Sequence, residues 1–193
     1  MAVVIAKRRA PALVGGLILA TFIVVEGRLR KGAEARSFSA EGTDGHTTRD
    51  VGVAFGMSAL GCPLVAESRI GRLSLPYAWA GVGLMGVGLG LRVRAAQTLG
   101  EYYTRTLRTA EDQAVVDAGL YRFVRHPGYL GVLTMWLGYG LAASSGPAAI
   151  GAVAVNGVAY SRRIRTEEEM LVKALPDYVA YQRRTSRLIP GVW

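Results

Sequence analysis

The sequence predicts an all-α integral membrane protein with about five transmembrane helices. Apolar residues make up 51% of the 193 residues, and charged residues make up only 19%. Five segments carry almost no charge, namely 10–25, 51–66, 75–91, 128–144 and 147–160. Together these segments leave too little polar surface for a soluble fold. Each is shorter than the roughly 20 residues of an ideal span, so we expect a thin or locally compressed bilayer.

The basic residues predict how these spans are oriented. Five spans with a cytoplasmic C-terminus place every basic residue on the cytoplasmic side except Lys7, Arg8, Arg9, Arg69 and Arg72. Cytoplasmic loops carry such an excess of Lys and Arg, although the first three exceptions argue locally against the arrangement. The net charge of +9 fits attraction to an anionic inner leaflet. Because the basic residues flank spans, the sequence does not favour nucleic acid as a partner.

Glycine is abundant in the third apolar segment. The letters from Gly81 to Gly86 match the dinucleotide fingerprint G-x-G-x-x-G. However, no strand precedes them and no acidic residue follows at the required distance, so we interpret the match as accidental. Close helix packing is the favoured interpretation, with Gly86 and Gly90 spaced as a small-xxx-small motif. Approach of a ligand to the glycine backbone stays open as an alternative.

The sequence offers no metal site. His46 has no cysteine, histidine or acidic cluster near it at ligand spacing. Cys62 is the one cysteine of the chain, so no disulfide forms within it. We expect a buried packing residue at this position.

A charged and aromatic segment, from Gly119 to Tyr129, leads into the fourth apolar segment. Pro127 can open a helix at its first turn, so we expect the next span to begin there. The N-terminus of a helix suits a carboxylate or a phosphate. His126 adds a hydrogen-bonding group at this place, and Tyr129 adds a hydroxyl one turn into the helix. On this segment alone, a side chain that caps the helix is the simpler interpretation of His126.

A second polar cluster follows the fifth apolar segment. Arg163 and Glu167 are four residues apart and share a helix face. A carboxylate near the membrane is costly to bury unpaired, so Glu167 should meet a cation, either Arg163 or a ligand amine. A solvated helix with ordinary ion pairs stays the alternative. The uncharged turn at 141–147 makes a hairpin of the last two spans, so we expect the two clusters to be neighbours.

These motifs resemble the isoprenylcysteine carboxyl methyltransferase family, which is related to phospholipid N-methyltransferases of membranes. The similar pieces are TLGEYYTR, GLYRFVRHPGYLG, RIRTEEEML and DYVAYQRRTSRLIP. They cover roughly the C-terminal half of the chain. We therefore expect a single membrane domain over 1–193, with N-terminal spans and a polar connection at 1–74 and the methyltransferase core at 75–193.

The resemblance implies a cytoplasmic-face pocket for S-adenosylmethionine, built by the last spans and the C-terminal helix. Arg163 would face the methyl acceptor, and Glu168 is a candidate base for an acceptor that must lose a proton. Two departures affect the expected site: family members often have His in place of Gln113, and Leu175–Pro176 replaces a usual Phe-Gly. The cofactor contacts implied by the resemblance are Gln113, Ala114, Val115, Val116, Tyr121, His126, Pro127, Gly128, Tyr129 and Glu167.

The implied activity is methyl transfer to a lipophilic acceptor that enters from the bilayer, most simply the carboxylate of an isoprenylcysteine-like molecule. N- or S-methylation of a phospholipid amine or of a small apolar molecule stays open. A non-catalytic structural membrane protein and a transporter are alternatives of another class. A transporter would need charged groups in mid-span, and none lies within 128–160. The expected partners are the acceptor and membrane lipids, without nucleic acid or metal.

Overall fold

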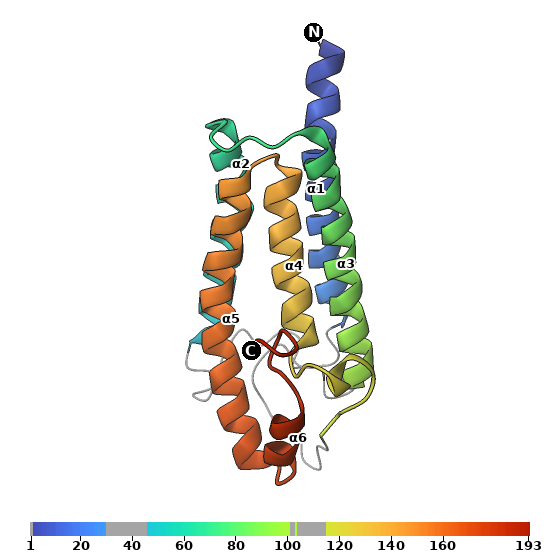
Figure 1. The fold of residues 1–193 in the computed structure, drawn as a ribbon, viewed down its shortest axis with the longest axis vertical. Helices are drawn as coiled ribbons and strands as arrows, with labels where there is room; N and C mark the ends of the chain where they lie inside the picture. Colours follow the sequence, from blue (N-terminus) through green and yellow to red (C-terminus); the bar gives the residue numbers. More distant parts are fainter. Residues whose placement is uncertain (1, 30–45, 101–102, 104–114) are drawn as a thin grey trace.

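The computed structural model describes residues 2–29, 46–100, 103 and 115–193. In this part of the chain, five long helices run along one bundle, and this confirms the all-α fold (Figure 1). A 3-10 helix, η3, and the short helix α6 lie at one end of the bundle. The elements are α1 (Ala2–Leu29), α2 (Thr47–Glu67), α3 (Leu75–Leu99), η3 (Gly119–Arg122), α4 (Pro127–Ala142), α5 (Gly146–Ala174) and α6 (Tyr178–Arg184).

Each apolar segment of the sequence lies within one long helix, except that the fourth extends two residues beyond the end of α4. Two of the described helices, over Arg9–Leu29 and Thr47–Glu67, are long and apolar enough to cross a membrane. Large apolar side chains point outward from the bundle, as expected where helices face lipid. On the long helices the most exposed of these, at 68–72%, are Leu13, Leu17, Leu60, Leu64 and Ile150.

Glycines mediate the contact between α3 and α4. A Cβ atom added to Gly81 would lie 2.6 Å from the carbonyl oxygen of Gly138, and Gly88 faces the α4 backbone in the same way. Only glycine lets two helices approach so closely. The predicted kind of packing is therefore confirmed, but the predicted residues were wrong. Added Cβ atoms on Gly86 and Gly90 would meet nothing within 4 Å, so these glycines lie on another face of α3.

A tight turn joins α4 to α5 at the end of the bundle away from α6 (Figure 1). Ser145 caps α5, since its hydroxyl accepts a hydrogen bond of 3.2 Å from the backbone N–H of Ala148. The chain between α2 and α3 supports the turn, because Leu73 N donates to Ser144 O at 2.9 Å. The predicted hairpin is thus confirmed, and the start of α4 lies beside the C-terminal half of α5.

Candidate functional site

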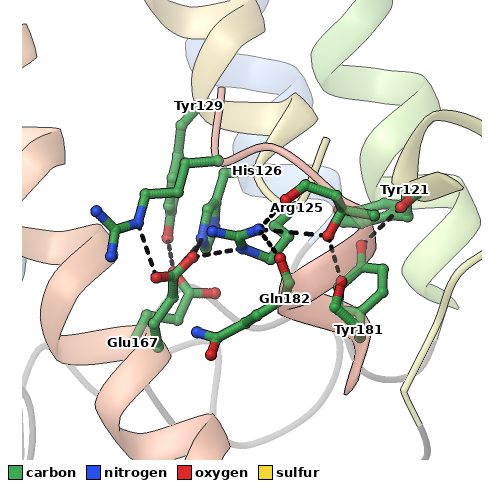
Figure 2. A network of polar contacts seen from close by, with 10 residues as sticks. Tyr121, Arg125, His126, Tyr129, Glu167, Tyr181 and Gln182 are labelled. Carbon is green, nitrogen blue, oxygen red and sulfur yellow. Dashed lines mark hydrogen bonds and ion pairs between the residues drawn. The ribbon is translucent and has the colours of Figure 1, made fainter. Parts of the chain in front are cut away.

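The hairpin brings the two polar clusters of the sequence together. His126 immediately precedes α4, whereas Glu167 and Glu168 lie in the C-terminal part of α5. Figure 2 shows Arg125, His126 and Tyr129 gathered beside the helix that carries Glu167. His126 and Glu168 are both buried. The neighbourhood predicted from the hairpin is therefore confirmed.

Glu168 is a buried carboxylate with three cationic or N–H partners. Its Oε1 accepts a hydrogen bond of 2.7 Å from Arg125 Nε and lies 3.2 Å from His126 Nε2. Its Oε2 accepts a hydrogen bond of 2.9 Å from Arg187 Nε. Burial alone would raise the pKa of Glu168, but the hydrogen bonds from His126 and Arg125 outweigh it and lower the pKa to about 2. Glu168 is therefore an anion at neutral pH.

Glu167 faces a different set of groups, although it is the adjacent residue. Its Oε2 accepts a hydrogen bond of 2.7 Å from the Tyr129 hydroxyl. Arg163 Nε donates to the same hydroxyl at 2.9 Å, so Tyr129 links a carboxylate to a guanidinium. His126 Nδ1 lies 3.8 Å from Glu167 Oε2, and the His126 and Tyr129 rings are stacked with centroids 5.4 Å apart. Glu167 keeps 24% of its side chain exposed, so a ligand can reach it.

Arg163 also contacts the start of α2, which the sequence did not reveal as part of the site. Its NH1 group donates to Thr48 Oγ1 at 3.0 Å and lies 3.4 Å from Thr47 Oγ1. The Arg163 side chain is buried. The N-terminal half of the chain therefore helps to fix this guanidinium.

The C-terminal segment after α6 pairs with the chain that leads into α4. Arg125 N donates to Ser186 O at 2.8 Å, and His126 N donates to Arg187 O at 3.1 Å. The Arg125 guanidinium also donates to the backbone oxygen of Thr185. Sequence reasoning assigned no role to Arg125 or Arg187. The motif DYVAYQRRTSRLIP contains Arg187, but nothing in its spacing indicates that it returns to α4.

The remaining predicted cofactor residues lie around η3 and the end of α5. Tyr121 is buried, and its backbone oxygen accepts a hydrogen bond of 2.7 Å from the Tyr181 hydroxyl. Val115 packs against a cluster that includes Leu175, so the departure at position 175 supplies an apolar anchor between α5 and α6. Val116 is partly buried beside Val115. Gln113 and Ala114 lie outside the described residues.

The N-terminus of α4 offers fewer free N–H groups than its sequence suggests. Pro127 has no N–H, and the N–H groups of Tyr129 and Leu130 both donate to His126 O at 3.1 Å. Gly128 N–H is the one N–H of the first turn that has no hydrogen-bond partner among the described residues. A Cβ atom at Gly128 would lie 2.8 Å from Arg92 NH1, so a side chain here would displace that guanidinium.

A second ion pair lies next to this turn. Arg92 on α3 donates to Glu26 at the end of α1, with distances of 2.6 Å from Nε and 3.2 Å from NH2. The Tyr103 hydroxyl donates to the same carboxylate at 3.1 Å. No spacing rule predicts the pairing of Glu26 with Arg92, because 66 positions separate them. Within residues 2–29, 46–100, 103 and 115–193, no group of three or more acidic, histidine or cysteine side chains could hold a metal ion.

Comparisons with known proteins show what this chain is similar to. Residues 81–173 match the model of the isoprenylcysteine carboxyl methyltransferase (ICMT) family. The fold is similar to the solved structure of the eukaryotic intramembrane Ras methyltransferase ICMT, with a TM-score of 0.63 and 20% sequence identity. The similarity covers 72% of this chain and 52% of that chain, so this chain spans about half the length of that protein. No curated protein matches the chain in sequence.

Proposed function

Because residues 81–173 match the model of the isoprenylcysteine carboxyl methyltransferase family, we propose that this protein methylates the carboxylate of a lipophilic, isoprenylcysteine-like acceptor with S-adenosylmethionine. One observation supports the proposal most. The Tyr129 hydroxyl lies between the Glu167 carboxylate and the Arg163 guanidinium, at 2.7 Å and 2.9 Å. A group that attracts cations therefore stands next to a group that attracts anions. This pair fits an ammonium-bearing cofactor beside a carboxylate-bearing acceptor.

The residues present fit S-adenosylmethionine. Glu167 and His126 offer acceptors to an ammonium group, and the Gly128 N–H can donate to a carboxylate. The partly buried Val115 and Val116 can lie against an apolar ring. The cofactor, when bound, supplies a methyl group on a positively charged sulfur. The proposed contacts remain Gln113, Ala114, Val115, Val116, Tyr121, His126, Pro127, Gly128, Tyr129 and Glu167.

Arg163 is proposed to hold the acceptor carboxylate through charge-assisted hydrogen bonds. A carboxylate is already a nucleophile, so the protein has only to align it and to exclude water. An amine or a thiol would first have to lose a proton to a base. Glu168 is a weak base because its pKa is lowered to about 2. The site therefore favours methylation on oxygen over methylation on nitrogen or sulfur.

The site is proposed to lie on the cytoplasmic side of a membrane that all five long helices cross. The N-terminus and the C-terminal segment lie at opposite ends of the bundle (Figure 1), as an odd number of crossings requires. The distribution of Lys and Arg favours a cytoplasmic C-terminus. Labelling from outside intact cells, with a cysteine introduced at one end of the chain or the other, tests this orientation. A C-terminal cysteine that is labelled from outside would contradict it.

Binding and transfer by the purified protein test the proposed function. We expect S-adenosylhomocysteine to bind the detergent-solubilised protein in a calorimeter. With radiolabelled S-adenosylmethionine and N-acetyl-S-farnesylcysteine, we expect a product that releases its label in base, as a methyl ester does. The matching carboxamide should not be labelled. Failure of the wild-type protein to bind S-adenosylhomocysteine would contradict the proposal. A label that stays on a lipid amine after base treatment would show that the protein methylates nitrogen and not oxygen.

The substitution Glu167→Gln tests the cofactor contact. It keeps the shape of the side chain but removes the charge that would meet the ammonium. A hydrogen bond to a charged group contributes about 1.5–3 kcal/mol, so we expect affinity for S-adenosylhomocysteine to fall roughly 10–100-fold. Glu169→Gln is the matched control, because Glu169 is exposed on the same helix. Equal affinities of the two variants would contradict the role of Glu167.

A further inference from the structure

We propose that Glu168 is a positioning residue for His126, and that Arg187 of the C-terminal segment helps it to fix the His126 tautomer. In this arrangement His126 carries its proton on Nε2 and presents a lone pair on Nδ1 beside Glu167. The inference rests on the proposed function, because the lone pair would accept a hydrogen bond from the cofactor ammonium. It replaces the base role predicted for Glu168.

The proton on Nε2 follows from the state of Glu168. An ionised carboxylate can only accept hydrogen bonds, and the low pKa of Glu168 keeps it ionised at neutral pH. His126 Nε2 lies 3.2 Å from Glu168 Oε1, so the ring nitrogen must be the donor in this pair.

The lone pair on Nδ1 follows from the other side of the ring. Glu167 Oε2, the nearest acidic atom there, is 3.8 Å from Nδ1, which is too far for a hydrogen bond. The same oxygen already accepts from the Tyr129 hydroxyl. Two acceptors thus lie side by side with no hydrogen bond between them. An incoming ammonium group can satisfy both.

Two guanidinium groups hold the Glu168 carboxylate in place, Arg125 at 2.7 Å from Oε1 and Arg187 at 2.9 Å from Oε2. Because both oxygens are held, Oε1 stays opposite His126 Nε2. The groups that face this pair are Glu167 and Glu168 from α5, Tyr129 from α4, Arg125 from the preceding segment, Tyr178 from α6, and Arg187 from the C-terminal segment.

The C-terminal segment fixes this arrangement by backbone and side chain together. The Arg187 backbone oxygen accepts from His126 N, and the Arg187 side chain reaches Glu168. The Arg187 guanidinium also lies over the Trp193 ring, 5.6 Å from its centroid. Arg187 keeps 36% of its side chain exposed, so it can be replaced with less disturbance than the buried Arg125.

Nitrogen NMR of the ligand-free protein tests the tautomer directly. The chain has two histidines, so ¹⁵N-histidine labelling gives two ring systems, and His46→Asn assigns the signals of His126. We expect a protonated Nε2 and an unprotonated Nδ1 at neutral pH. A proton on Nδ1, with or without one on Nε2, would overturn the inference. Because no cofactor is added, this result does not depend on the proposed function.

The substitution Arg187→Met tests the part played by the C-terminal segment. With the Arg187 guanidinium removed, Glu168 Oε2 loses its hydrogen bond and the carboxylate is held less firmly opposite His126 Nε2. We expect the affinity for S-adenosylhomocysteine to fall about tenfold, since a hydrogen bond that fixes the site is lost, and the nitrogen NMR signals of His126 to show a share of the tautomer protonated on Nδ1.

Two controls separate positioning from folding. Arg187→Lys keeps the charge and should bind as the wild type does. Arg184→Met removes an exposed arginine that pairs with Asp117, and should change neither affinity nor tautomer. An equal loss of affinity in Arg187→Met and Arg187→Lys would overturn the positioning role. Wild-type affinity together with an unchanged His126 tautomer in Arg187→Met would do so as well.

Discussion

The middle of the bundle and its polar end are held together by different means. In the middle, α3 and α4 meet through glycines whose backbones nearly touch. At the polar end, carboxylates and guanidiniums join elements that are distant in sequence, as in the pairs Arg125–Glu168 and Arg92–Glu26. Lipid is as apolar as the helix faces, so close packing has to supply the contact in the middle. Near water, charge pairing can instead set the position of individual side chains.

This difference predicts which changes destabilise each region. The glycine contact depends on shape, so its stability should depend on side-chain size and not on pH. The polar end depends on charge, so it should respond to protonation. A glycine variant whose stability depends on pH, or a charge variant whose stability does not, would contradict this difference between the two regions.

The largest effect is expected at the glycine contact. A leucine at position 88 would drive its side chain into the backbone of α4 at Gly131 and Met135. Overpacking of a core costs about 1–3 kcal/mol when side chains can yield, and backbone yields less. We therefore expect Gly88→Leu to give no folded protein in detergent gel filtration. Gly90→Leu is the matched control, since an added Cβ there meets nothing within 4 Å. A folded Gly88→Leu protein would contradict the claim that close glycine packing holds α3 and α4 together.

Acid should weaken the polar end selectively. The pKa of Glu168 falls from an ordinary 4.5 to about 2, so its charge stabilises the fold above pH 4.5, and this contribution is lost as the pH falls toward 2. The shift corresponds to roughly 3 kcal/mol. Thermal unfolding between pH 2 and 6 should show this loss in the wild type and in Glu169→Gln. Glu168→Gln should lack it, and an unchanged pH profile in that variant would contradict the assignment.

The overall fold was predictable because strong local signals mark the helices. Pro127 begins α4, and the uncharged turn before Pro147 forces α4 and α5 into a hairpin. That hairpin alone predicts that His126 and Glu167 are neighbours. The partners that the sequence missed come from tertiary contacts. Arg187 and Glu26 reach the site region from opposite ends of the chain, and no spacing rule connects them with α4 or α3.

The packing glycines of α3 were mispredicted for a related reason. The helix is apolar on all sides, so its sequence does not tell which face meets protein and which meets lipid. Gly81 and Gly88, which are seven residues apart, meet α4, whereas Gly86 and Gly90, which have the small-xxx-small spacing, do not. Only the position of α4 shows which glycines are in the contact.

The smallest effect is expected at a polar contact in the middle of the bundle. Asn156 is fully buried on α5 and donates to Ser58 Oγ of α2 at 2.7 Å. It also donates to Ala152 O at 2.9 Å, while its Oδ1 has no partner among the described residues. Hydrogen bonds between membrane helices contribute only about 0.6 kcal/mol on average. The unpartnered oxygen reduces the net contribution of Asn156 further.

A double-mutant cycle with Ser58→Ala and Asn156→Val measures this contact. We expect each variant to change the free energy of unfolding by less than about 1 kcal/mol, with a coupling of about 0.6 kcal/mol. Unfolding in mixed detergent, followed by tryptophan fluorescence, gives these energies. A coupling above about 2 kcal/mol would exceed the range known for such bonds. The middle of the bundle would then depend on hydrogen bonding as well as on shape, and its contrast with the polar end would fail.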